Sequence, residues 1–232
     1  MKNKSIFSAS VVSFLLLCFF YSCKESLSDI TIGQVSAETL AKDSKFNEII
    51  EGLNVLQMRF QRQKSSIQNK KEKQAFSSKL QFLASKARNN NLDQADIEDW
   101  SNMLGYSDCQ SMLTVDAEQK KRVDELFSQY PTLKEASDKE KKLLFEKAFN
   151  IFYSKYSVQV VARYVDPNTD CQSAYAICSA AAFGGYMVML TGPCQGAWIL
   201  GPTGFTACAT GASLVYAGAL YGCWDRYCSN AT

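Results

Sequence analysis

The chain of 232 residues contains no histidine. Histidine is the usual general base, a member of most nucleophile triads and a frequent metal ligand. Its absence excludes His-based triads and His-ligated metal sites, so catalysis would have to rely on carboxylates, lysine, tyrosine or thiols. No nucleophile motif is present either. The sequence therefore favours a protein that is not an enzyme, with no catalytic residue, no cofactor and no metal site.

Three further absences narrow the function. The chain has no Cys-x-x-Cys pair, which argues against thioredoxin-like redox chemistry. It has no glycine-rich loop of the kind that binds phosphate before residue 167, because Gly33 and Gly105 are isolated glycines. Residues 24–170 carry 22 basic and 22 acidic side chains, so bulk charge gives no reason to expect nucleic-acid binding.

The N-terminus has the pattern of an export signal. Lys2 and Lys4 precede an apolar run from Ile6 to Tyr21, which ends at Ser22 and Cys23. The segment Phe20-Tyr21-Ser22-Cys23 resembles the lipobox of bacterial lipoproteins, which implies that Cys23 is lipid-modified and becomes the first residue of the mature chain. A plain cleaved signal, with Cys23 as an ordinary thiol, is the alternative.

Both interpretations place the protein outside the cytoplasm. The lipoprotein resemblance implies a membrane partner through the N-terminal lipid, and a location in the bacterial cell envelope, at the outer membrane or the cell surface. We expect residues 1–22 to be the signal peptide. Residues 23–43 are rich in serine, threonine and acidic side chains, and we expect them to form a flexible tether.

Residues 44–166 show helical periodicity and predict a charged helical bundle. Apolar residues recur every three or four positions from Phe46 to Phe60, and a second helix is predicted over Lys70 to Arg88. Further helices are expected after Asp93 or Asp96, over Val115 to Tyr130, and from Ser137 to as far as Tyr164. Gly105 suits a helix C-terminal turn. Thr132–Glu135 and Ser137–Glu140 have the capping-box pattern.

Residues 167–232 differ from the rest of the chain in charge and in cysteine content. No charged side chain lies between Cys171 and Trp224, and six of the nine cysteines lie in this tail. An even set of cysteines in an exported chain predicts a disulfide framework, with structural zinc as the alternative. Cys109 is left over, either buried and free or a source of dimers.

Helix geometry suggests how the six cysteines pair. Ala174 to Leu190 and Gly204 to Cys223 are predicted as two helices joined by a Gly-Pro-rich turn. Cys171 and Cys178 are about 10 Å apart along one helix face, too far to bridge each other. An antiparallel hairpin instead aligns three pairs: Cys178 with Cys223, Cys171 with Cys228, and Cys194 with Cys208. The predicted fold is therefore all-α, a helical bundle followed by a disulfide-stapled antiparallel helical hairpin.

Small residues at helical spacing predict the inner faces of this hairpin, because they allow two helices to approach closely. The predicted packing residues are Ala174, Ala181, Gly185, Gly211, Gly218 and Gly222. The larger side chains, such as Phe183, Tyr186 and Tyr216, would then point outward and require burial against the bundle, a lipid surface or an unidentified protein partner. Spanning a bilayer with both helices is an alternative.

The tail also resembles the halocin family of cysteine-rich peptide bacteriocins. The similar pieces are Cys171-x6-Cys178, the apolar stretch from Ser179 to Gly185, Cys208, and Tyr221-Gly222-Cys223. In that family an apolar, disulfide-rich peptide forms the C-terminus of an exported precursor. Two functions follow as expectations: a lipid-anchored protein whose hairpin is a structural or binding module, or a bacteriocin-like toxin precursor with the middle region as carrier or immunity part.

Overall fold

The computed structural model describes residues 30–89, 91–156, 172–192, 194 and 201–227. These residues are almost entirely helical, and the predicted all-α class is confirmed. The described residues from Thr31 to Tyr227 belong to one compact unit. The predictions for Cys23, Cys171 and Cys228, and for the signal peptide, concern residues outside the described ranges.

The elements follow one another in a simple order. Two antiparallel strands and a short helix come first: β1 (Thr31–Ile32), β2 (Val35–Ser36) and α2 (Ala37–Lys42). The longer helices of the first half are α3 (Ser44–Ser66), α4 (Lys70–Arg88) and α5 (Gln94–Met103). The second half contains α6 (Cys109–Gln129), α7 (Thr132–Glu135), α8 (Asp138–Tyr156), α10 (Gln172–Thr191) and α12 (Gly201–Tyr227).

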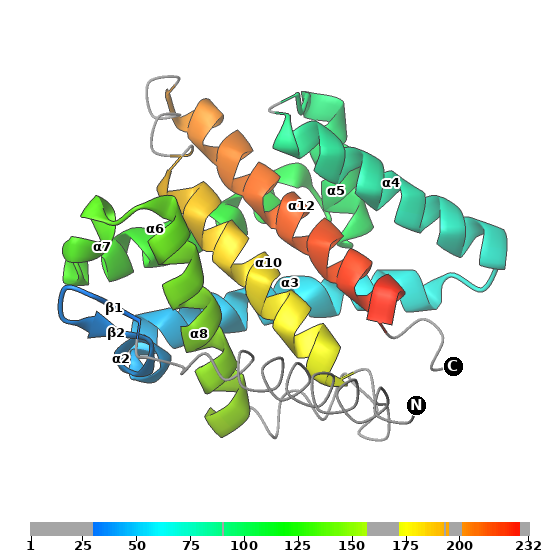
Figure 1. Ribbon diagram of the computed structural model, residues 1–232. Helices are drawn as coiled ribbons and strands as arrows, with labels where there is room; N and C mark the ends of the chain where they lie inside the picture. The colour runs from blue at the N-terminus through cyan, green and yellow to red at the C-terminus, as the bar shows by residue number, and fades with distance from the viewer. Residues whose placement is uncertain (1–29, 90, 157–171, 193, 195–200, 228–232) are drawn as a thin grey trace, which may run out of the picture. The chain divides into compact units, whose positions relative to one another are not determined.

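The last two helices lie at the centre of this unit (Figure 1). Helices α10 and α12 run side by side in opposite directions, and α3 crosses behind them. Helix α10 contacts α8 and α6, whereas α12 contacts α4, α5 and α6. The apolar tail is thus surrounded by helices from the first two thirds of the chain.

Side-chain caps explain where several helices begin. The Asp43 carboxylate accepts the backbone N–H groups of Lys45 and Phe46 at the start of α3. Asn69 caps α4, whose predicted bounds of Lys70 to Arg88 are confirmed. Asp93, rather than Asp96, is the N-cap of α5, and the two carboxylates form a reciprocal capping box. Each cap satisfies backbone donors that have no partner within the helix.

Two local predictions need correction. Helix α6 begins at Cys109, six residues before Val115, because the Asp108 side chain accepts the N–H of Ser111 and starts the helix there. The capping box predicted at Thr132–Glu135 does not form: Pro131 is the N-cap of α7, and the Thr132 hydroxyl donates to the carbonyl of Ile32 instead. The box between Ser137 and Glu140 is present.

The predicted flexible tether is also wrong for residues 31–42. Val35 and Ala37 are buried, and Leu40 and Ala41 are fully buried in α2, which packs against α8. Ser36 caps α2 through the N–H of Thr39. The polar side chains that suggested a tether occupy the exposed side and the caps of this segment, while its few apolar residues supply enough buried surface to hold it in place.

Large buried side chains fill the space between the helices. One cluster joins α3, α4 and α5 to α12 through residues that include Phe60, Leu83, Trp100 and Leu214. Gly105, with φ of +67°, ends the α5 turn as its sequence position predicted. The core is therefore shared between the bundle and the tail.

Candidate functional site: the cross-linked hairpin and its surroundings

Two disulfides join α10 and the segment after it to α12. Cys178 pairs with Cys223 across the hairpin, with their Cα atoms 5.7 Å apart. Cys194 pairs with Cys208 near the turn, with a Cα separation of 5.5 Å. Both pairings are the ones predicted from antiparallel helix geometry. The hairpin is therefore cross-linked at two positions, one between its two helices and one near its turn.

The prediction that small residues form the inner faces of the hairpin is wrong. Ala181 is exposed, and a Cβ atom added at Gly185 or Gly222 would meet no atom within 4 Å. Gly211 and Gly218 are buried, but they face Ala87 and Ala84 of α4 rather than α10. The side chain of Ala174 lies outside the described residues. The small residues therefore serve the contact with α4 or lie at the surface, and they do not join the two hairpin helices.

The close approach at Gly218 predicts a sharp difference between two glycine substitutions. In Gly218→Ala the new Cβ would lie 2.7 Å from the Cβ of Ala84, so α12 and α4 must move apart. We expect a loss of about 1–3 kcal/mol in the free energy of unfolding. Gly222→Ala is the matched control, because open space surrounds that position. It should gain up to about 1 kcal/mol through helix propensity. Urea denaturation of both variants measures the difference.

Aromatic side chains make the contacts that the glycines were expected to make. Tyr186 of α10 and Tyr216 of α12 are both buried, with ring centroids 5.6 Å apart between the two helices. Phe183 is fully buried and packs edge-on to Phe46 of α3 and stacked on Phe149 of α8. Of the three burial surfaces considered for these side chains, the structure places these rings against the helical bundle.

A buried carboxylate lies where α6 meets α12. Asp116 is 4% exposed, and its Oδ2 atom accepts a hydrogen bond from Thr210 Oγ1 at 2.8 Å. Burial raises the pKa of Asp116 to about 7, although hydrogen bonds from Thr210 and Ser213 act in the opposite direction. Among the described residues, no lysine or arginine forms an ion pair with it.

Sequence reasoning missed Asp116, although a signal was present. Met112, Asp116 and Val123 follow helical spacing on the buried side of α6, and all three are inaccessible in the structure. An acidic residue in register with apolar core positions indicates a buried carboxylate. The basic run of α6, Lys120-Lys121-Arg122, also has a buried member: Lys120 is 1% exposed and pairs with Asp124.

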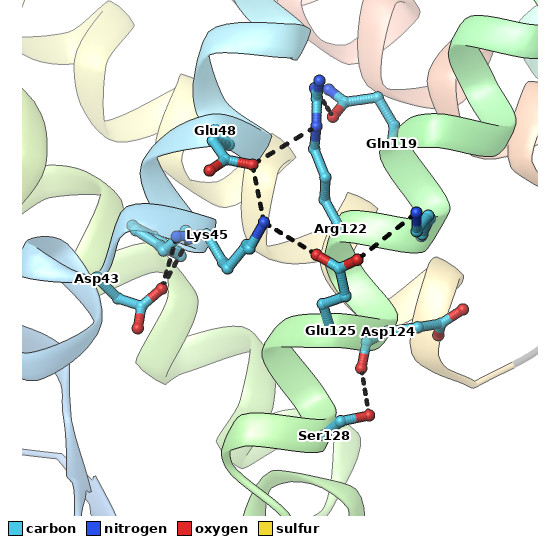
Figure 2. A network of polar contacts seen from close by, with 10 residues as sticks. Asp43, Lys45, Glu48, Gln119, Arg122, Asp124, Glu125 and Ser128 are labelled. Carbon is cyan, nitrogen blue, oxygen red and sulfur yellow. Dashed lines mark hydrogen bonds and ion pairs between the residues drawn. The ribbon is translucent and has the colours of Figure 1, made fainter.

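A second polar cluster joins α3 to α6 at the surface (Figure 2). Lys45 lies between two carboxylates, 3.0 Å from Glu125 and 3.3 Å from Glu48. The hydrogen bond to Glu125 and the one to Glu48 raise the pKa of the Lys45 ammonium group. Arg122 donates to Gln119 at 3.0 Å and lies 3.9 Å from Glu48. All four charged groups are at least one third exposed, so each pair contributes little to stability.

Polar and aromatic side chains also meet in a cleft beside the hairpin. A shallow cleft between α3, α10 and α12 is lined by residues that include Gln57, Phe60, Tyr175 and Tyr221. The Gln57 amide donates to the Tyr175 hydroxyl at 3.0 Å, and the Lys64 ammonium group lies 4.2 Å above the Tyr221 ring. The described residues that line the cleft do not bring a nucleophile and a base together.

The described residues also bear on the state of Cys109, on the alternative of a zinc site and on the alternative of a membrane span. Cys109 is free and half-buried, and burial raises the pKa of its thiol. In residues 30–89, 91–156, 172–192, 194 and 201–227, no group of three or more cysteine, aspartate or glutamate side chains is arranged to hold a metal ion. None of the helices within these ranges has both the length and the apolar character of a membrane span.

Comparison of the chain with protein-family models, with curated proteins and with solved structures found no match.

Proposed function

We propose that this protein is an exported, lipid-anchored and non-enzymatic helical protein of the bacterial cell envelope, in which the disulfide-linked hairpin is a structural module. The two disulfides carry this proposal, because stable disulfides form in oxidising compartments outside the cytoplasm. The signal-like N-terminus and Cys23 agree with the same location. The anchor would supply the membrane partner.

Burial of the hairpin supports a structural role over release as an antimicrobial peptide. Phe183, Tyr186 and Tyr216 are within the core, and α12 also packs on α4 at Gly218. Cutting the tail free would expose these aromatic rings and remove a central part of the core from the helical bundle. Each buried aromatic side chain contributes a few kcal/mol to folding, so the separated bundle would lose much of its stability.

Lipid anchoring is tested with two cysteine variants expressed in a bacterial host. We expect Cys23→Ser to lose the lipid and to move from the membrane fraction to the soluble periplasmic fraction. Cys18→Ser is the matched control, because its cysteine lies within the predicted signal and is not the lipobox cysteine. It should remain membrane-bound. Membrane binding by Cys23→Ser equal to that of the natural protein would contradict the anchor.

Mass spectrometry of the mature protein tests the rest of the proposal. The expected result is one intact chain that begins with acylated Cys23, has a free thiol at Cys109 before reduction, and gains further alkylatable thiols only after reduction. A fragment that begins between residues 157 and 172 would instead support the bacteriocin-like alternative. Free thiols at Cys178 and Cys223 in the untreated protein would contradict export to an oxidising compartment.

A further inference from the structure

The cluster around Asp116 is made of an acid and two hydroxyl groups from different helices. Asp116 belongs to α6, whereas Thr210 and Ser213 belong to α12 and are 0% and 1% exposed. Thr210 Oγ1 donates to the carboxylate at 2.8 Å, and the Ser213 hydroxyl donates to the Thr210 carbonyl at 2.9 Å. Burial raises the pKa of Asp116, and the hydroxyl groups of Thr210 and Ser213 lower it. These contacts span 94 residues of sequence and join the hairpin to the bundle.

The charged and titratable groups around Asp116 do not neutralise it. Tyr186 of α10 and Tyr106, which precedes α6, interact with it electrostatically, and burial raises the pKa of both phenols. Cys109 of α6 is influenced by Asp116, by Asp108 and by Glu98 of α5, all of which raise its thiol pKa. The neighbouring cations act on the phenols: Arg59 of α3 on Tyr106, and Arg122 of α6 on Tyr186.

We propose that Asp116, Thr210 and Ser213 form a pH-sensitive latch that holds α12 on α6 while the carboxyl group is protonated and loosens when it is ionised. A neutral carboxyl group can both donate and accept hydrogen bonds, so a buried position beside the hydroxyl groups of Thr210 and Ser213 suits it. An ionised carboxylate without a cation is costly at a buried position. Opening the contact between α6 and α12 lets water reach the charge.

The disulfides determine what moves when the latch loosens. Cys178–Cys223 and Cys194–Cys208 tie α12 to α10 and the segment after it, so the hairpin must move as a unit. The contacts of α12 with α4 and α5, and those of α10 with α8 and α6, would open with it, whereas the contacts between α3 and α6, and between α2 and α8, need not change. A protein in the cell envelope experiences the pH of its surroundings, and the latch would respond to it.

Hydrogen–deuterium exchange of the full mature chain, read by mass spectrometry, tests the latch. Protection factors corrected for the intrinsic pH dependence of exchange are compared at pH 5.5 and pH 8.0. Because the Asp116 pKa is about 7 in the closed state and near the ordinary aspartate value of 3.8 when exposed, opening should become about 30-fold more favourable. Peptides from α12 should lose protection by this factor and should remain less protected than peptides from α2, whose exchange requires unfolding of the whole chain.

Three variants separate the latch from a general effect of pH. Asp116→Asn carries no titrating group, so its α12 protection should be the same at both pH values. Glu118→Gln, at an exposed position on the same helix, should behave like the natural protein. Thr210→Val removes a hydrogen bond that lowers the Asp116 pKa, so α12 should continue to lose protection to a higher pH. This variant provides a second test if Asp116→Asn does not fold.

Three results would overturn the proposal. The first is unchanged α12 protection in the natural protein between pH 5.5 and pH 8.0. The second is equal protection of α2 and α12 at pH 8.0, which would indicate global unfolding and no separate latch. The third is a pH response in Asp116→Asn, or a Thr210→Val response identical to that of the natural protein.

Discussion

The double variant Cys178→Ala, Cys223→Ala is expected to unfold with a free energy about 4 kcal/mol lower than that of the natural protein. The disulfide closes a loop with a sequence separation of 45 residues, and removing it returns that loop-closure entropy to the unfolded chain. Cys223 is buried, so the two small side chains also leave unfilled space next to Tyr175 and Trp224 at the end of the hairpin.

Urea denaturation followed by circular dichroism measures this loss. The slope of the free energy against urea should rise in the double variant, because its unfolded chain is more expanded and exposes more surface. Cys109→Ala is the matched control. It removes a half-buried free thiol and no cross-link, so its effect should be about 1 kcal/mol or less. A double variant as stable as this control would show that the hairpin does not depend on its disulfide.

The course of the helices in the charged region could be predicted from the sequence because local signals there agree. In α4, Asn69 supplies a cap, Asn89 ends the helix, and the apolar face from Leu80 to Ala87 points in one direction. The disulfide pairs Cys178–Cys223 and Cys194–Cys208 could be predicted from helix geometry. Two antiparallel helices of nearly equal length have a fixed register, which brings only certain cysteines level with one another.

The faces of the hairpin helices could not be predicted in the same way. Periodicity reveals which side of a helix is buried only when the other side is polar. Helices α10 and α12 have almost no polar side, so the sequence does not distinguish the face toward α4 from the face toward α10. Gly218 therefore seemed to belong between the hairpin helices, whereas it touches Ala84. Tyr186 and Tyr216 fill the position it was expected to take.

Long-range contacts account for the other misses. Leu40 is fully buried only because α8, about a hundred residues later, covers α2, and a window of local sequence contains no information on that contact. Asp116 was missed for a related reason. Its position in α6 indicates burial, but its hydroxyl partners at 210 and 213 lie almost a hundred residues away. Local signals predict elements, and the partners of each face follow from tertiary packing.

The replacement of Asp116 by asparagine should remove most of the pH dependence of global stability between pH 5 and pH 8. A carboxyl group whose pKa is raised by folding stabilises the folded state fully below its unfolded pKa. This stabilisation decreases as pH rises toward the folded pKa. With values near 3.8 and 7, the total loss is about 4 kcal/mol, of which about 3 kcal/mol falls between pH 5 and pH 8.

Because the chain has no histidine, no imidazole group contributes to the pH dependence of stability in the same range. The carboxylates with lowered pKa values, including Asp93, Asp108 and Glu125, lose their protons below this window. Urea denaturation at pH 5 and pH 8 should therefore show a decrease of about 3 kcal/mol in the natural protein and in Glu118→Gln, and little change in Asp116→Asn. At pH 8 the asparagine variant should be the more stable protein. If the natural protein is instead equally stable at both pH values, Asp116 is not held as a neutral acid in the folded state, and its contact with Thr210 is an ordinary hydrogen bond to a carboxylate that water can reach.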